Sequence, residues 1–126
     1  MSAVSVKSGR HVGTVLMVFA AVHAGVSGVL FSDWLLVILQ GGIGNLTWTA
    51  ETLAAFWFLI FSWPVWVLGY VVNWAYRNTG RLPPFLGAWI FIVPALSLVF
   101  LPASGLWLFA IFGAVVLVNE AARRAA

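Results

Sequence analysis

The chain contains no cysteine and very little charge. Its 126 residues include six Lys or Arg and three Asp or Glu, 7% of the sequence, whereas 63% are hydrophobic. The absence of cysteine excludes disulfides, thiolate metal sites, iron–sulfur clusters and cysteine nucleophiles. A soluble domain of this length is about a quarter charged, and so few charges cannot cover the surface of a globule. We therefore predict one integral membrane domain, residues 1–126, whose surface mostly faces lipid.

The basic residues are few, but they raise the sequence pI to about 10.2. Such a value can indicate nucleic-acid binding. Here it depends on six side chains placed before, between or after apolar runs: Lys7, Arg10, Arg77, Arg81, Arg123 and Arg124. Membrane topology explains that placement better, so we expect no nucleic-acid partner.

Four apolar runs predict an all-α integral membrane fold, a bundle of four transmembrane helices. A membrane helix needs about 20 mostly apolar residues, because lipid offers no partner to free backbone groups. The runs cover residues 12–31, 52–74, 85–101 and 105–118. The last two are short and read as a hairpin across Pro102-Ala103-Ser104, with Pro102 or Ser104 starting the fourth helix. Thr49 is the expected N-cap of the second helix.

The charges give this bundle a direction. In a four-span arrangement all six basic residues fall on one side of the membrane and none on the other. The positive-inside rule assigns that side to the cytoplasm. We expect a multi-pass protein of the cytoplasmic (plasma) membrane, with both termini in the cytoplasm. The N-terminal pattern also fits a signal peptide, but we interpret residues 12–31 as the first span.

Residues 33–49, between the first two spans, form a shorter apolar segment interrupted by glycines. The segment is too short to cross a bilayer. One interpretation is an interfacial or re-entrant helix, capped by Asp33, that lies over the outer mouth of the bundle. The other is an ordered loop anchored in the headgroup zone by Trp34 and Trp48.

His23 is the one ionisable residue in the first run. Ionisable groups inside a membrane are costly unless they are used or paired. Ala20, Ala24 and Gly28 form a ridge of small residues beside it, and Ser27 follows one turn later. Small residues mark close helix packing in membranes, so we predict that His23 points into the bundle. It is either part of a functional site or a neutral histidine that only hydrogen-bonds Ser27 or a neighbouring helix.

The second run carries a stripe of residues spaced by three, four or seven positions, which predicts an inward face: Glu51, Ala55, Phe58, Ser62, Gly69 and Asn73. Glu51 lies at its outer end and could share an outward-facing cavity with His23. Burial brings the pKa values of a carboxylate and an imidazole toward each other, which suits proton transfer. The alternative for Glu51 is a first-turn charge solvated by headgroups.

The candidate site follows from these two faces. We assign His23 and Glu51 as candidate catalytic residues. The candidate ligand-binding residues are Asn45, Trp57, Ser27 and Ser62. The deeper tryptophans, Trp57, Trp63, Trp66 and Trp89, could line a pocket for a flat ligand or pack against acyl chains.

The cofactor of such a site is unknown from the sequence. His11 and His23 lie too far apart on one helix to share a metal ion within a subunit, so we predict no metal site. A single membrane histidine could ligate haem in a homo-oligomer, but nothing else in the chain supports haem.

Several short strings, in order along the chain, resemble a family of small bacterial four-span membrane proteins of unknown function. They are His23 with Gly25, Gly44-Asn45, Phe56-Trp57-Phe58, Leu82-Pro83 and Pro102-Ala103-Ser104-Gly105-Leu106-Trp107. The resemblance implies the four-span fold and no particular activity. It favours His23, Asn45 and Trp57 as parts of a shared outward-facing site.

Three functions remain open. The first is binding of a hydrophobic small molecule in an outward-facing pocket inside the bundle, with membrane lipid around it, and possible acid–base isomerase or cyclase activity. The second is a proton-linked small transporter or channel. The third is a non-catalytic membrane subunit or scaffold. The first is favoured because two titratable groups are expected at one mouth.

Overall fold

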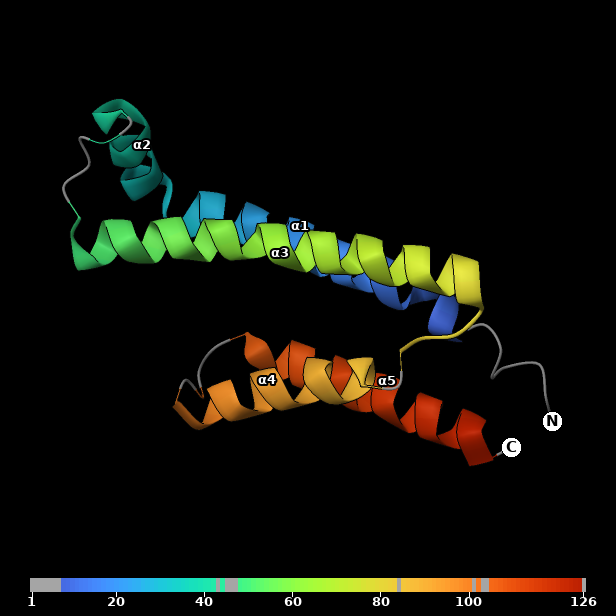
Figure 1. Ribbon diagram of the computed structural model, residues 1–126. Helices are drawn as coiled ribbons and strands as arrows, with labels where there is room; N and C mark the ends of the chain where they lie inside the picture. The colour runs from blue at the N-terminus through green and yellow to red at the C-terminus, as the bar shows by residue number, and fades with distance from the viewer. Residues whose placement is uncertain are drawn as a thin grey trace. The chain divides into compact units, whose positions relative to one another are not determined.

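The computed structural model describes residues 8–42, 44, 48–83, 85–100, 102 and 105–125. After a 3-10 turn at Ser8–His11, these residues form five α-helices, coloured from blue to red along the chain in Figure 1. The helices are α1 (Val12–Leu30), α2 (Ser32–Gly41), α3 (Ala50–Thr79), α4 (Leu86–Phe100) and α5 (Leu106–Ala125).

The all-helical prediction is confirmed for the described residues, and α1, α3, α4 and α5 coincide with the four apolar runs. Three of them are long and apolar enough to cross a membrane, over Val12–Leu30, Ala50–Thr79 and Leu106–Arg123. The fourth, α4, has 15 residues and is shorter. It is bounded by turns at Phe85 and Pro102. The helices are compatible with a multi-pass membrane protein.

The start of α3 is set by a reciprocal cap between two threonines. The Thr49 N–H donates to Oγ1 of Thr52 at 2.9 Å, and the Thr52 N–H donates to Oγ1 of Thr49 at 3.3 Å. This arrangement satisfies two backbone donors that a helix start leaves without partners, as a capping box does. It confirms Thr49 as the N-cap.

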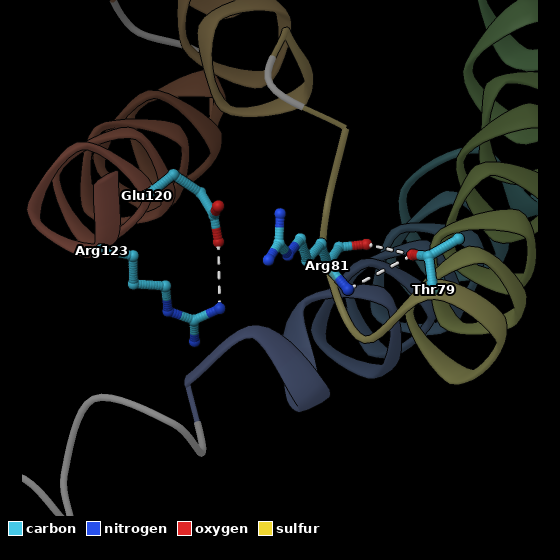
Figure 2. Close-up of polar contacts among 4 residues, drawn as sticks. All are labelled: Thr79, Arg81, Glu120 and Arg123. Carbon is cyan, nitrogen blue, oxygen red and sulfur yellow. Dashed lines mark hydrogen bonds and ion pairs between the residues drawn. The ribbon is translucent and has the colours of Figure 1, made fainter. Parts of the chain in front are cut away.

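The far end of α3 extends past the predicted span because polar side chains continue the helix. The Asn78 amide donates to the Trp74 carbonyl at 2.8 Å. Gly80 has φ +67°, the left-handed conformation that ends many helices. In Figure 2 the Thr79 hydroxyl lies between two backbone groups of Arg81, accepting the N–H at 3.2 Å and facing the carbonyl oxygen at 2.8 Å.

The helix α5 also continues past its predicted end at residue 118. Its last turns contain an ion pair between Glu120 and Arg123, 3.2 Å apart and three residues apart on one face, which Figure 2 shows. Such pairs add only slightly to helix stability. The predicted span ends at residue 118 because hydropathy falls at Asn119, whereas the helix does not stop there.

The chain divides into two compact units. One comprises Gly13–Val72, and therefore nearly all of α1, all of α2 and most of α3. The other comprises Met1–Val12 and Asn73–Ala126, and therefore contains α4 and α5.

In the first unit, α1 and α3 run antiparallel with their backbones in close contact (Figure 1). A Cβ added at Gly69 would lie 2.6 Å from the Gly13 carbonyl oxygen and 3.0 Å from the Met17 nitrogen. Only glycine fits at such a distance. The buried residues on this contact include Leu16, Ala20 and Ser27 of α1, and Ala55, Ser62 and Val65 of α3. The stripe predicted on the second run is confirmed at Ala55, Ser62 and Gly69.

The ridge predicted on α1 was only half right. Ala20 is buried, but Ala24 is half-buried and Gly28 is exposed, with no atom within 4 Å of an added Cβ. Residues spaced by four advance about 40° beyond a full turn at each step. The series from Ala20 to Gly28 therefore rotates away from α3, whereas Ser27, seven residues after Ala20, stays on the contact.

In the second unit, α4 and α5 form an antiparallel hairpin with an equally close backbone contact (Figure 1). A Cβ added at Gly113 would lie 2.6 Å from the Phe91 Cα, and one at Gly87 would lie 3.0 Å from the Leu117 Cα. The buried side chains of these two helices are apolar: Leu86, Ile90, Pro94, Ala110 and Val116.

The short helix α2 agrees with the helical interpretation of residues 33–49, but Asp33 is not its cap. The N-cap is Phe31, with no side-chain cap hydrogen bond, and Asp33 lies in the first turn. A side-chain cap is not needed because the chain passes almost directly from α1 into α2. The Phe31 N–H still bonds the Ser27 carbonyl at 3.0 Å, and its own carbonyl accepts the Leu35 N–H at 2.8 Å. No residue of α2 is buried.

Candidate functional site

The imidazole of His23 faces α3, as predicted, and is half-buried there. Its Nε2 lies 3.0 Å from the backbone carbonyl oxygen of Phe58. Because a carbonyl oxygen only accepts, Nε2 must carry the proton. When the ring is neutral, Nδ1 is then its acceptor. This contact with a neighbouring helix fixes the tautomer of the ring.

Phenyl rings surround the imidazole. The ring of Phe58 stacks on His23 with centroids 4.1 Å apart and an interplanar angle of 24°. Phe61 meets it edge-on at 6.0 Å, and Phe31 packs on Phe58 at 5.3 Å. Phe61 is half exposed. The result is a polar ring held in an aromatic cluster, which we call the His23 cluster: His23, Phe31, Phe58 and Phe61.

Two buried hydroxyls lie one helical turn away from this contact, one on α1 and one on α3. Ser27 follows His23 by four residues and is 0% exposed, and Ser62 follows Phe58 by four residues and is 7% exposed. Neither hydroxyl oxygen has a hydrogen-bond partner within the described part of the chain. Unpaired buried hydroxyls are uncommon in native proteins. Their burial also places both beyond direct reach of a ligand at the protein surface.

The antiparallel register shows how these groups are spaced. Since Gly13 lies against Gly69 and His23 against Phe58, moving toward the end of α1 means moving toward the start of α3. Ser27 and Ser62 therefore lie on opposite sides of the His23 contact, each about 6 Å along its own helix. His23 and the two serines form one polar row in the contact between the two helices.

Glu51 is not brought to His23. It precedes Phe58 by seven residues, about 10 Å along the helix, and its side chain is exposed. It lies just before the expected span of residues 52–74. Its backbone N–H and the Thr49 side chain stabilise the carboxylate and lower the pKa of Glu51, where burial would have raised it. Glu51 thus lies exposed in the first turn of α3, the position that its alternative interpretation gave it.

Of the two remaining predicted ligand-binding residues, only Trp57 lies among the described residues, and it is exposed. Trp57 is 59% exposed and contacts Phe56 edge-on at 5.5 Å. Asn45 lies outside the described residues. All eight tryptophans are exposed, the deeper Trp57, Trp63, Trp66 and Trp89 included. Within the described ranges no three His, Asp or Glu side chains come together to hold a metal ion.

Sequence reasoning missed the partner of His23. The Phe58 carbonyl is a backbone atom, so no residue type signals it. Phe58 did stand in the predicted inward stripe, next to Ser62 in that series, and this spacing was the one available signal. The phenyl rings of Phe31 and Phe61 carried none, because phenylalanine is common throughout the chain.

Fold and site together define an all-helical protein, compatible with several membrane crossings, with a histidine held in the contact between two long helices. The chain belongs to the DUF6463 family, a family of unknown function, whose model matches residues 7–123. This agrees with the resemblance to an uncharacterised family. No curated protein and no solved structure matches the chain.

Proposed function

We propose that this protein crosses the plasma membrane four times, with α1, α3, α4 and α5 as spans and both termini in the cytoplasm. The six basic residues support this topology, since all of them fall on one side of a four-span arrangement. The 15-residue α4 is short for a span, but its close hairpin contact with α5 supports a shared insertion.

Single cysteines in this cysteine-free chain test the topology. A membrane-impermeant maleimide added to intact cells is expected to label Asp33→Cys, in the first turn of α2 just past the outer end of α1. Asn78→Cys, at the cytoplasmic end of α3, is expected to react only after lysis. Labelling of both variants in intact cells contradicts the four-span arrangement.

The function we propose is binding of a lipophilic small molecule with a hydrogen-bonding head group at the His23 cluster, on the outer half of α1 and α3. The observation that supports it is the half-buried imidazole of His23 among phenyl rings. Such a group is costly inside a membrane unless it is used or paired, and within the described residues only Nε2 is paired, with the Phe58 carbonyl, which leaves Nδ1 to a ligand. The imidazole offers the head group a hydrogen bond, and half-exposed Phe61 offers the apolar body a flat contact.

The proposal is limited to binding. Acid–base isomerase or cyclase activity depended on a second titratable group beside His23. Glu51 is about 10 Å away along α3 and exposed, so it does not supply one. The His23 cluster by itself supports recognition of a head group.

Mass spectrometry of lipophiles extracted from the purified protein tests the binding. Wild type is expected to carry one class of molecule in near-stoichiometric amount. His23→Phe keeps a flat ring but loses both ring nitrogens. The variant should therefore retain about tenfold less lipophile than wild type, the fold-change that loss of one hydrogen bond to a buried group produces. The matched control is Trp63→Phe, an aromatic change at a 73% exposed position of the facing helix α3, which should retain the full amount.

Two results contradict the proposal. One is an equal amount of the molecule in wild type and in His23→Phe. The other is the absence of any enriched lipophile from the wild-type protein. A normal thermal unfolding midpoint for His23→Phe in detergent separates lost binding from lost folding.

A further inference from the structure

The backbone carbonyl that would ordinarily accept a hydrogen bond from the Ser62 hydroxyl already accepts one from another side chain. In membrane helices a serine hydroxyl commonly bonds the carbonyl four residues earlier. This chain does so elsewhere: Ser97 donates to Val93 at 2.9 Å, and Thr79 lies 2.8 Å from the Ala75 carbonyl. For Ser62 the carbonyl four residues earlier is that of Phe58, the oxygen to which His23 donates.

The Phe58 carbonyl cannot readily serve both side chains. A carbonyl oxygen has two lone pairs, and one of them accepts the helical N–H of residue 62, since α3 is helical throughout this region. One lone pair remains for two side-chain donors, the His23 imidazole and the Ser62 hydroxyl. In the structure the His23 imidazole donates to this second lone pair, and the Ser62 hydroxyl is buried without a partner among the described residues.

We propose that Ser62 is a positioning residue that exchanges with His23 at the Phe58 carbonyl. A rotation of the serine side chain transfers the hydrogen bond to Ser62 and frees the imidazole. Whether His23 or Ser62 donates, the Phe58 oxygen accepts one side-chain hydrogen bond and the other side chain keeps an unpaired donor. Neither arrangement is therefore strongly preferred. A ligand that gives the freed Nε2–H an acceptor shifts the balance toward the Ser62-held arrangement.

This inference rests on the proposed function, and it narrows the ligand class. The donor left over when Ser62 takes the carbonyl is an imidazole N–H. The head group that stabilises this arrangement must therefore carry an acceptor oxygen, as a carbonyl or hydroxyl does. A lipophile whose head group can only donate would not drive the exchange.

Ser27 provides the matched control. It is also a buried hydroxyl without a partner among the described residues. The carbonyl four residues before it, however, belongs to the backbone of His23 and not to Phe58. Replacing Ser27 removes an unpaired hydroxyl of the same kind without changing the competition at the Phe58 oxygen.

Nitrogen-15 NMR of labelled histidine in the ligand-free, full-length protein tests the exchange directly. The measured quantity is the solvent exchange rate of the His23 Nε2–H, assigned by its loss in His23→Phe. Ser62→Ala removes the competitor, so exchange should slow by about two- to tenfold, the range that one net hydrogen bond supports. Ser62→Thr keeps a hydroxyl and should match wild type, as should Ser27→Ala.

The proposal is overturned if Ser62→Ala leaves the exchange rate unchanged, or if Ser27→Ala slows it equally. Should Ser62→Ala fail to fold, Ser62→Cys replaces it, because a thiol is only a weak donor. A second measurement compares lipophile retention, which Ser62→Ala should lower by about two- to tenfold. The NMR result needs no ligand, so failure of the proposed function and failure of the exchange can be told apart.

Discussion

The α1–α3 pair and the α4–α5 hairpin achieve close contact in the same way but bury different chemistry. In both, glycine allows one helix to touch the backbone of the other, at Gly69 and at Gly113. Small residues commonly serve this purpose in membranes, where lipid is as apolar as the helices themselves. Only the first contact also encloses an imidazole and unpaired hydroxyls. The second has an apolar set of buried side chains.

The different chemistry of the two helix contacts suggests that they serve different purposes. The apolar hairpin has no buried polar group among its described residues that its packing must accommodate, so its close contact is explained by stability alone. The first pair tolerates unpaired hydroxyls beside a histidine, which packing alone does not explain. Substitutions in the hairpin should therefore change stability, whereas substitutions in the first pair should change the His23 contact as well.

The largest expected effect is from adding one methyl group at the glycine contacts. In Gly113→Ala the new Cβ meets only the backbone of α4, which cannot move aside, and the free energy of unfolding should fall by about 3 kcal/mol. In Gly69→Ala the new Cβ meets the backbone of Gly13 but also the flexible Met17 side chain, so the free energy of unfolding should fall by only about 2 kcal/mol. Unfolding in mixed micelles, followed by tryptophan fluorescence, measures both.

Gly28→Ala is the control for these variants, because nothing lies within 4 Å of its added Cβ. It should leave stability unchanged or raise it by up to about 1 kcal/mol, the difference in helix propensity between alanine and glycine. If Gly28→Ala is as harmful as Gly113→Ala, the close contacts are not the cause of the loss.

The smallest expected changes in stability come from replacing one serine in each helix pair. Ser27→Ala removes a buried hydroxyl without a partner among the described residues and should stabilise the protein by about 1 kcal/mol. Ser97→Ala in α4 removes a hydroxyl that donates to Val93, so it should destabilise by about 0.5 kcal/mol. The same unfolding measurement should give opposite signs. Destabilisation by Ser27→Ala shows that its hydroxyl has a partner after all.

The helix positions could be predicted because long apolar runs are typical of membrane helices, in which the backbone groups pair with one another. The ends of α3 and α5 were less predictable. Hydropathy marks where the apolar run stops, whereas the helix stops where caps such as Gly80 end it. The close contact at Gly113 was also unexpected, because glycine alone does not show which backbone it meets.

At the candidate site, the orientation of His23 and the burial of Ser62 were predictable from helical spacing. The register between α1 and α3 was not. That register decides that His23 lies at the level of Phe58 and not of Glu51, and it depends on contacts such as Gly13 with Gly69. The competition for one backbone oxygen follows from the register and so could not be seen in the sequence.

If α3 and α4 both span the membrane, as proposed, their unequal apolar lengths have a consequence for the surrounding bilayer. At 1.5 Å per residue, the predicted apolar span of α3, residues 52–74, extends about 34 Å, and the 15 residues of α4 about 22 Å. A hydrocarbon core is about 30 Å thick. Helices respond to such hydrophobic mismatch by tilting or by deforming the nearby lipid. A thicker membrane suits α3 and a thinner one suits α4, so acyl-chain length is a variable to which this small protein should respond.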